Sequence, residues 1–354
     1  MRGRLADVDG YAVIAADTAS ATPAAPCLLT IIERVFTGHA PTRGLARGQC
    51  AEIATGAPLP DGADAVVMVE ETVPAADGQV GIRAAAAAGQ NIGRRGAEIS
   101  PGDFVVRTGD LLNPSRIGAM AAIGCADVEV FCRPRVAVLS TGNEVVEPGH
   151  ALAGAQIYDV NRFTLAAVIE AHGGSAEPHP PARDTIESLE TALAACAGAD
   201  VMIFSGGSSV GERDLIVDLV ERHGTMVFHG IAVKPGKPIA FGTREDGKVW
   251  FGLPGNPLST WVGFLIFVSA WLGDELPRES RQVARKMDRK PGREEFLPAQ
   301  RLPSGEVTIR NLIGSHANFG LLESDGLVRI NPDVITLVQG EHIDFLPFPW
   351  NRNP

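Results

Sequence analysis

Short, wholly apolar segments alternate with helical segments between residues 133 and 272, and this alternation constrains the fold more than any other feature of the sequence. Residues 136–139 (VAVL) and 201–204 (VMIF) contain no polar side chain. Such segments suit a parallel sheet whose two faces are both covered. Strands that alternate with helices predict βαβ units. We therefore expect a parallel α/β domain in this part of the chain.

The expected elements of this α/β domain can be placed along the chain. Strands are expected at residues 136–139, 201–204, 227–232 and 249–252, and helices at 160–172, 186–197, 215–223 and 258–272. The most apolar stretch, residues 261–272, is shorter than the roughly 20 residues that cross a bilayer, so we interpret it as a buried helix. Residues 1–9 lack the apolar core of a secretory signal.

The flanking parts of the chain show a different pattern. Residues 27–110 contain short β-rich segments at 28–35, 65–69, 79–82 and 104–106, separated by Gly, Pro and Asp, which predicts a small β domain. One helix is expected at residues 114–123, with Asn113 as its N-cap and Gly124 after its end, followed by a short strand that ends near residue 130. Residues 278–293 are rich in Arg and Lys and suggest a charged linker before a last β domain.

The composition excludes several classes of protein. The 354 residues include 42 acidic and 31 basic side chains, a formal net charge of -11, which disfavours a binder of nucleic acid or of anionic membranes. The 5 cysteines form no C-x-x-C pair, so neither a disulfide framework nor a zinc cluster is indicated. These features favour a location in the reducing cytoplasm.

Glycine-bearing loops follow the apolar strands at residues 140–144, 205–211, 234–238 and 253–257. The carboxyl ends of parallel strands share one edge, and open α/β sheets bind ligands there, so we expect these loops to converge. Glycine lets backbone N–H groups turn toward an anion. Lys234 and Lys237 add positive charge to the same site.

Acidic residues stand close to the same loops. Glu144, Asp184 and Asp214 lie at loop ends or helix starts. Together with lysines and bare amides they suit a phosphate-bearing ligand with a divalent metal, or a heterocycle whose N–H donors need carboxylate acceptors. Each loop alone is more often a tight turn, and an acid at a helix start is more often a cap. The combination of the loops with two lysines between prolines favours a functional site.

A series of motifs resembles one known family. The motifs are residues 9–13 (DGYAV), 55–60 (TGAPLP), 62–67 (GADAVV), 140–144 (STGNE), 156–161 (QIYDVN), 205–214 (SGGSSVGERD), 234–238 (KPGKP) and 253–257 (LPGNP). In this order they resemble the molybdopterin molybdenumtransferases (MoeA proteins), which include the E domain of gephyrin. The resemblance covers nearly the whole chain.

The resemblance implies an α/β, multidomain fold. Its expected parts are a β-rich domain at residues 1–102, a remnant of the linking first domain at 103–132, a parallel-sheet α/β molybdopterin-binding domain at 133–280 and a C-terminal β domain at 281–354. It implies a cytoplasmic homodimer that converts adenylylated molybdopterin and molybdate, with Mg²⁺, into molybdenum cofactor and AMP. A molybdopterin adenylyltransferase and molybdoenzyme maturation proteins are the partners implied.

The resemblance also implies roles for residues of this chain. Asp9 and Thr55 would come from the partner subunit, while Glu144, Asp184 and Asp214 would serve metal and pterin recognition, with Glu144 and Asp214 as the metal ligands. Lys234, Lys237, Ser259 and Ser315 would hold molybdate. The implied cofactor-binding residues are Gly142, Gly206, Gly207, Ser209, Gly211, Pro238, Pro254, Gly255, Asn256, Pro257, Ser259 and Ser315.

The chain departs from the family pattern at several positions. The usual first fifty or so residues are missing, residues 5–8 read LADV where Asn-Ser-Ala-Met is expected, and residues 96–99 read GAEI where Gly-Glu-Asp-Ile is expected. Asn143 replaces an aspartate, and Pro298 replaces an arginine that would help hold the oxyanion, so Arg293 or Arg301 would have to take its place.

These departures keep two other functions open. The first is a noncatalytic paralogue that binds molybdopterin or a nucleotide as a carrier, regulator or scaffold. The second is an adenylyltransferase of molybdopterin, which uses a similar α/β domain. The additional β domains and the loop at residues 253–257 argue against the second.

Overall fold

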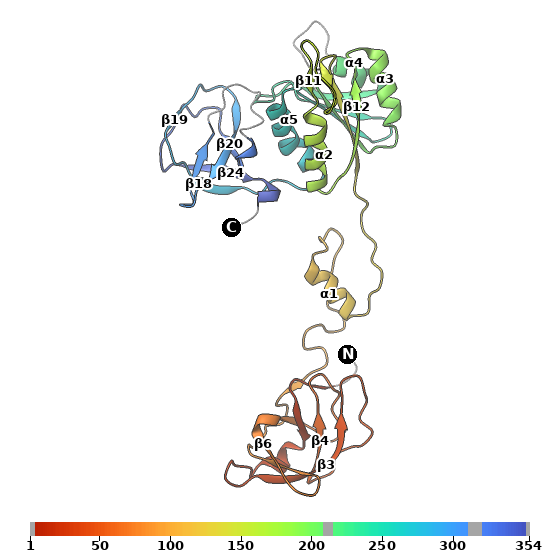
Figure 1. The fold of residues 1–354 in the computed structure, drawn as a ribbon, viewed down its shortest axis with the longest axis vertical. Coiled ribbons are helices and arrows are strands. Elements are labelled where there is room, and N and C mark those ends of the chain that lie inside the picture. The colour runs from red at the N-terminus through yellow and green to blue at the C-terminus, as the bar shows by residue number, and fades with distance from the viewer. Residues whose placement is uncertain (1–3, 208–214, 311–320, 352–354) are drawn as a thin grey trace. The chain divides into compact units, whose positions relative to one another are not determined.

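The computed structural model of the protein describes residues 4–207, 215–310 and 321–351. The chain forms two compact units, Met1–Glu129 and Val130–Pro354. The first unit contains the red and orange strands of Figure 1, and the second runs from the green helices to the blue C-terminal strands.

The first unit is built on a six-stranded sheet in the order β5-β2-β4-β3-β7-β6. Alternate residues of its strands pack into two separate cores: Ala12 and Val66 belong to one, and Val13 and Val67 to the other. This is the period of two expected of a strand. The strands predicted at residues 28–35, 65–69 and 79–82 are confirmed. The strands of this unit are β1 (Leu5–Ala6), β2 (Gly10–Val13), β3 (Cys27–Val35), β4 (Gln49–Ile53), β5 (Ala65–Met68), β6 (Thr72–Pro74), β7 (Gln79–Ile82) and β8 (Ile92–Gly93).

One predicted helix is confirmed near the end of the first unit, and two predicted strands are wrong. Helix α1 (Pro114–Ala122) begins as expected, with the side chain of Asn113 accepting a hydrogen bond from the N–H of Arg116. Neither residues 104–106 nor the segment that ends near 130 forms a strand. No described residue pairs with either segment, and an isolated strand has no partner for its backbone groups. Phe104 is accordingly 74% exposed.

The second unit contains a six-stranded sheet in the order β12-β9-β13-β17-β16-β14. The first four strands are parallel, and three of them, β9, β13 and β17, were predicted. β16 is antiparallel to β17, and β14 is antiparallel to β16, so β14 runs in the direction of the first four strands. The strand expected at residues 227–232 corresponds to β14, which begins and ends three residues earlier, and β16 was not predicted. The strands are β9 (Arg135–Thr141), β12 (Ser175–Ala182), β13 (Val201–Ser205), β14 (Gly224–His229), β16 (Ala240–Arg244) and β17 (Val249–Leu253), and the two-stranded ribbon β10 (Val145–Val146) and β11 (Ile157–Tyr158) lies outside this sheet.

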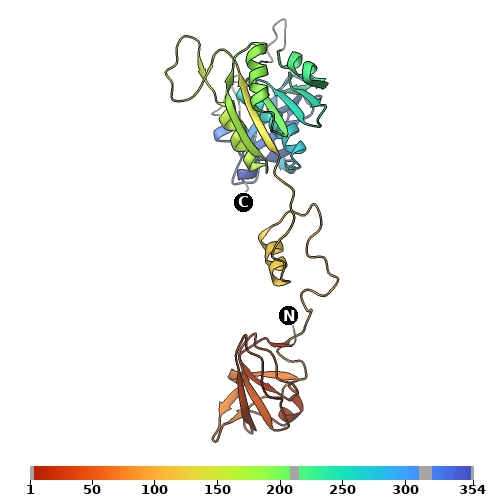
Figure 2. The ribbon, with the colours of Figure 1, turned by 90° about the vertical axis from the view of Figure 1, so that its right-hand side faces the viewer.

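Helices cover both faces of this sheet. One core joins α2 to α5 and the segment after it, and another core contains α3 and α4 (Figure 2). The predicted helix at residues 258–272 consists of three consecutive segments, the middle one a π-helical turn. Among the described residues no helix is long and apolar enough to cross a membrane. The helices are α2 (Asn161–Ala171), α3 (Ile186–Ala195), α4 (Leu215–His223), α5 (Pro257–Gly263), the π-turn (Phe264–Val268) and α6 (Ser269–Trp271).

The C-terminal sheet packs against the α/β part through a shared core. Phe296, Leu327 and Phe348 lie in the same cluster as Leu258 and Val262 of α5. The charged stretch at residues 278–293, interpreted as a linker, instead contains β18 and β19, so that interpretation is wrong. The strands are β15 (Val233–Lys234), β18 (Glu279–Gln282), β19 (Met287–Asp288), β20 (Glu294–Arg301), β21 (Val307–Ile309), β22 (Gly326–Ile330), β23 (Thr336–Leu337) and β24 (His342–Pro347).

Candidate functional site

Three of the predicted loops meet at the carboxyl edge of the parallel strands. β13 lies between β9 and β17, and all three strands run in one direction, so the loops that follow them are neighbours. The N–H of Gly206 donates to the carbonyl of Leu253 across 3.1 Å. A Cβ on Gly206 would lie 2.4 Å from the carbonyl oxygen of Thr141, and its φ is +104°. Only glycine fits at this point, and the expected convergence is confirmed for these three loops.

A buried asparagine ties two of the loops together. Asn161, the first residue of α2, donates from its side-chain amide to the hydroxyl of Ser205 and to the carbonyl of Gly255, both at 2.8 Å. Thr260 of α5 donates to the carbonyl of Pro254 and stands 3.5 Å from the Ser205 hydroxyl. Sequence reasoning quoted Asn161 within a motif but gave it no role. Its place at the start of a predicted helix, within the motif at residues 156–161, was the available signal.

A second buried group supports the loop after β9. Asp159 accepts hydrogen bonds from the hydroxyl of Ser140 at 2.8 Å and from the N–H of Arg162 at 3.1 Å. The guanidinium of Arg162 pairs with Glu147 at 2.7 Å and donates to the carbonyl of His179. Buried charges require a partner. Oδ2 of Asp159 accepts no hydrogen bond from a described residue, but it lies 3.4 Å from Nε of Arg162, so the carboxylate is paired. Sequence reasoning missed Asp159 and Arg162 as well.

The acidic residues lie beside the same loops. Asp184 donates its backbone N–H to the side chain of Asn143 at 3.3 Å, and Gly142 donates to the carbonyl of Ala182 at 3.2 Å. Burial raises the pKa of Asp184, a hydrogen bond from the backbone of Asn143 lowers it, and the charge of Glu144 raises it. Oδ1 of Asp184 is buried and accepts no hydrogen bond from a described residue. The structure thus brings Glu144 and Asp184 into one electrostatic environment.

The loop with the two lysines belongs to the edge of the C-terminal sheet. Lys234 pairs in β15 with Glu295 of β20, and its ammonium lies 2.6 Å from that carboxylate. Lys237 is exposed and makes no ion pair with any described residue. A Cβ on Gly236 would lie 3.9 Å from the carbonyl oxygen of Ser259. The loop therefore approaches the first turn of α5, which follows the loop at residues 253–257.

The other predicted residues of that loop shape the start of α5. Asn256 is the N-cap of α5, and its carbonyl accepts from the N–H of Thr260 at 2.9 Å. Pro257 is the first helical residue, and Ser259 is buried in the first turn. Four predicted residues, Ser209, Gly211, Asp214 and Ser315, lie outside the described residues.

Three arginines are relevant to Pro298, which stands where the family pattern has an arginine. Arg293 donates to the carbonyl of Val233 at 3.3 Å, directly before Lys234. Arg301 is engaged elsewhere, since its guanidinium lies 3.3 Å from Glu279. Arg310, which sequence reasoning did not consider, donates its N–H to the carbonyl of Pro298 at 2.9 Å. Of the two arginines expected to replace the missing arginine, Arg293 and Arg301, only Arg293 lies beside the lysine loop, the loop at residues 234–238 that contains Lys234 and Lys237.

Asp9 and Thr55 meet in the first unit. Asp9 accepts hydrogen bonds from the N–H of Thr55 at 2.6 Å and from its hydroxyl at 2.8 Å. These two bonds, the backbone one first, lower the pKa of Asp9. The motifs at residues 9–13 and 55–60 thus form one local feature, although they are far apart in sequence.

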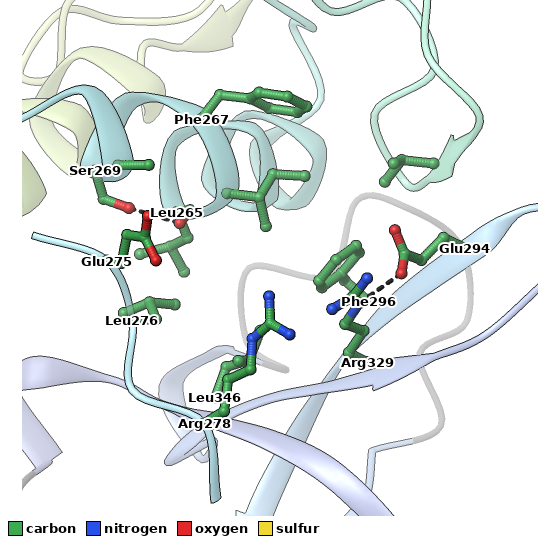
Figure 3. Close-up of a pocket in the computed structure, with 13 residues that line it drawn as sticks. Leu265, Phe267, Ser269, Glu275, Leu276, Arg278, Glu294, Phe296, Arg329 and Leu346 are labelled. Carbon is green, nitrogen blue, oxygen red and sulfur yellow. Dashed lines mark hydrogen bonds and ion pairs between the residues drawn. The ribbon is translucent and has the colours of Figure 1, made fainter.

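Two cavities lie in the second unit. One, of about 370 Å³, is lined by Val160, Pro257, Trp261, Leu321 and Trp350 among others, next to the starts of α2 and α5. The other, of about 290 Å³, lies between the π-turn and β20. Arg278 and Arg329 point into it in Figure 3, and Arg329 pairs with Glu294. Of the predicted site residues, Pro257 lines the first of these cavities.

Comparison with known proteins defines the class to which this fold belongs. Residues 4–124 match the MoeA N-terminal region (domain I and II), residues 137–274 match a probable molybdopterin binding domain, and residues 281–348 match the MoeA C-terminal region (domain IV). These matches, with the sheet-edge loops, define a multidomain protein of the molybdopterin biosynthesis class.

Individual relatives narrow this class to one family. Molybdopterin molybdenumtransferase 2 of Mycobacterium tuberculosis is 33% identical over 95% of this chain and 86% of its own length. The molybdopterin molybdenumtransferase of Haemophilus influenzae is 32% identical over 96% and 86%. The crystal structure of a molybdopterin biosynthesis MoeA protein from Pyrococcus horikosii shares 35% identity at a TM-score of 0.83 and covers 98% of this chain and 87% of that one. The chain belongs to the molybdopterin molybdenumtransferase (MoeA) family.

Proposed function

We propose that this protein inserts molybdate into adenylylated molybdopterin and releases AMP. The observation that supports this proposal is the convergence of the loops after β9, β13 and β17, fixed by the two hydrogen bonds of Asn161. Glycine at positions 142, 206, 207 and 255 keeps side chains away from this edge. Backbone N–H groups can then face a phosphate.

Lysine side chains would supply the charge that such a substrate requires. Molybdate is a dianion and must approach a pyrophosphate, so fixed cations are needed to offset the repulsion. Lys237 makes no ion pair with a described residue, and Lys234 retains further N–H donors beside Glu295. We propose that these two lysines bind the molybdate oxyanion together with Ser259 and, by resemblance, Ser315.

The carboxylates of Glu144 and Asp184 suit a divalent cation. Asp184 has a buried oxygen without a hydrogen-bond donor among the described residues, and Glu144 lies near enough to raise its pKa. Carboxylate oxygens are the ligands that Mg²⁺ prefers. Glu144 and Asp184, with Asp214 by resemblance, would hold Mg²⁺. A bound Mg²⁺ would neutralise charge on the pyrophosphate and polarise its phosphorus–oxygen bonds.

Further parts of the proposal rest on resemblance. A homodimer would place Asp9 and Thr55 of one subunit at the site of the other, and the protein would act in the cytoplasm. It would receive its substrate from a molybdopterin adenylyltransferase and deliver its product to molybdoenzyme maturation proteins. The two hydrogen bonds that lower the pKa of Asp9 stabilise its charged carboxylate, which suits a role in recognising N–H donors of the pterin.

An AMP-release assay tests the proposed function. Purified protein with adenylylated molybdopterin, Mg²⁺ and molybdate should release AMP and form active cofactor. Replacing Lys237 with Ala should slow AMP release about 100-fold or more, as loss of one charge-stabilising donor does in other sites. Lys290→Ala removes another exposed lysine and should leave the rate unchanged.

A noncatalytic relative is the second candidate, and one observation favours it. Pro298 stands where an arginine is expected, and Arg301 is directed to Glu279 rather than toward the lysine loop. Binding of the substrate without AMP release at any molybdate concentration would support this alternative and overturn the transferase proposal.

A further inference from the structure

Three side chains of alternating charge form a row from the interior of the C-terminal sheet to Lys234. The ammonium of Lys234 lies 2.6 Å from Oε1 of Glu295, and Nε of Arg289 lies 2.9 Å from Oε2 of the same carboxylate. The side chains of Glu295 and Arg289 are only 4% and 3% exposed, whereas that of Lys234 is 55% exposed. This row of charged side chains is therefore exposed to solvent only at Lys234.

Arg289 uses four of its five N–H donors within the protein. Its Nη1 donates to the carbonyls of Asn331 at 2.6 Å and Val334 at 2.7 Å, and its Nη2 donates to the carbonyl of Arg293 at 2.9 Å. With Nε bound to Glu295, the guanidinium serves only to neutralise that carboxylate and to fix the surrounding backbone. A buried carboxylate requires such a partner.

The net charge of these three side chains determines the electrostatic environment of a ligand. Two cations and one carboxylate leave one net positive charge, and it emerges at the exposed ammonium of Lys234. Glu295 uses one N–H of that ammonium, and two remain. Without Arg289, Glu295 would cancel the charge of Lys234; with Arg289, Glu295 can orient the ammonium without cancelling it.

We propose that Glu295 and Arg289 are positioning residues that hold Lys234 in place for an oxyanion and preserve its charge. This inference rests on the proposed function, because the oxyanion it names is molybdate. The pairing of Lys234 with Glu295 between β15 and β20 fixes the backbone of the lysine as well. The two residues act only through Lys234 and do not touch the substrate.

A double-mutant cycle on molybdate binding tests this inference. The dissociation constant of molybdate alone is measured by titration calorimetry for the full chain and for three variants. Lys234→Met should raise it about tenfold, the loss of about one charge-assisted hydrogen bond. Glu295→Gln should raise it about fivefold, since the ammonium is no longer held. The double variant should match Lys234→Met, because Glu295 has nothing left to position.

A matched control separates positioning from damage to the fold. Glu294, the preceding residue of β20, pairs with Arg329 instead, so Glu294→Gln breaks an ion pair on the same strand and should leave molybdate affinity within about twofold. If Glu295→Gln fails to fold, Glu295→Asp keeps the charge but shortens the side chain, and should weaken affinity in the same non-additive way.

Several results would overturn the inference. If the effects of Lys234→Met and Glu295→Gln multiply in the double variant, Glu295 acts independently of Lys234. If Glu295→Gln binds molybdate as the unaltered chain does, no positioning is needed. If Lys234→Met has no effect, Lys234 does not hold molybdate. None of these results decides the proposed function, which stands or falls on AMP release by the unaltered chain.

Discussion

Replacing Asn161 with Ala should loosen the loop cluster and weaken the second unit. The substitution removes two hydrogen bonds of 2.8 Å and leaves the carbonyl of Gly255 without this donor. Each lost bond costs about 1 kcal/mol, and an unsatisfied buried partner costs about 1–3 kcal/mol more. We therefore expect the free energy of unfolding to fall by about 3–5 kcal/mol. AMP release should fall as well, because the loops after β13 and β17 lose their connection.

Urea unfolding followed by tryptophan fluorescence measures this effect. All 4 tryptophans lie at positions 250, 261, 271 and 350, within the second unit, so the signal reports on that unit alone. Ser269→Ala is the control, since it removes a buried hydrogen bond of 2.6 Å to Leu265 in the helical segment away from the loops. It should cost about 1 kcal/mol and spare AMP release. A loss of stability in Asn161→Ala no greater than in this control would refute the reasoning.

Two further predictions concern carboxylates. Because burial raises the pKa of Asp184 above its usual 3.8, the folded state favours the neutral acid, and the stability that Asp184 contributes is lost as pH rises through its folded pKa. Asp184→Asn should raise the melting temperature at pH 7, and the gain should vanish in melts below pH 3.8; an unchanged gain at low pH contradicts the assigned cause. Thr55→Val removes one of the two hydrogen bonds that lower the pKa of Asp9. In an NMR titration, the pKa of Asp9 should therefore rise toward 3.8. An unchanged pKa would show that the Thr55 hydroxyl does not contribute.

The sequence predicted the parallel strands and the loops because both depend on local pattern. β9, β13 and β17 are continuous apolar segments, and each ends at a glycine-bearing loop. β12 was missed because Pro178, Pro180 and Pro181 argue against a strand. It lies at the edge of the sheet, where proline is tolerated. Edge position is a tertiary property that no short segment reveals.

The candidate site was predicted only in part for a similar reason. Lys234 was identified because it shares a loop of glycine and prolines with Lys237. Its partner Glu295 lies 61 positions further along the chain, where the sequence shows only the alternating pattern of a strand. The same holds for Asn161, whose contacts are with residues 44 and 94 positions away. Long-range pairings of this kind follow from strand order, and periodicity carries no information about them. The domain boundaries at residues 102, 132 and 280 remain predictions.

A crystal structure of the protein with AMP, molybdate and Mg²⁺ bound tests most directly whether the sheet-edge loops form the substrate site. We expect a phosphate of AMP within hydrogen-bond distance of backbone N–H groups at Gly207 or Gly255, and molybdate beside the ammonium groups of Lys234 and Lys237. Density for both ligands at another place, with these loops left in contact with solvent only, would contradict the account.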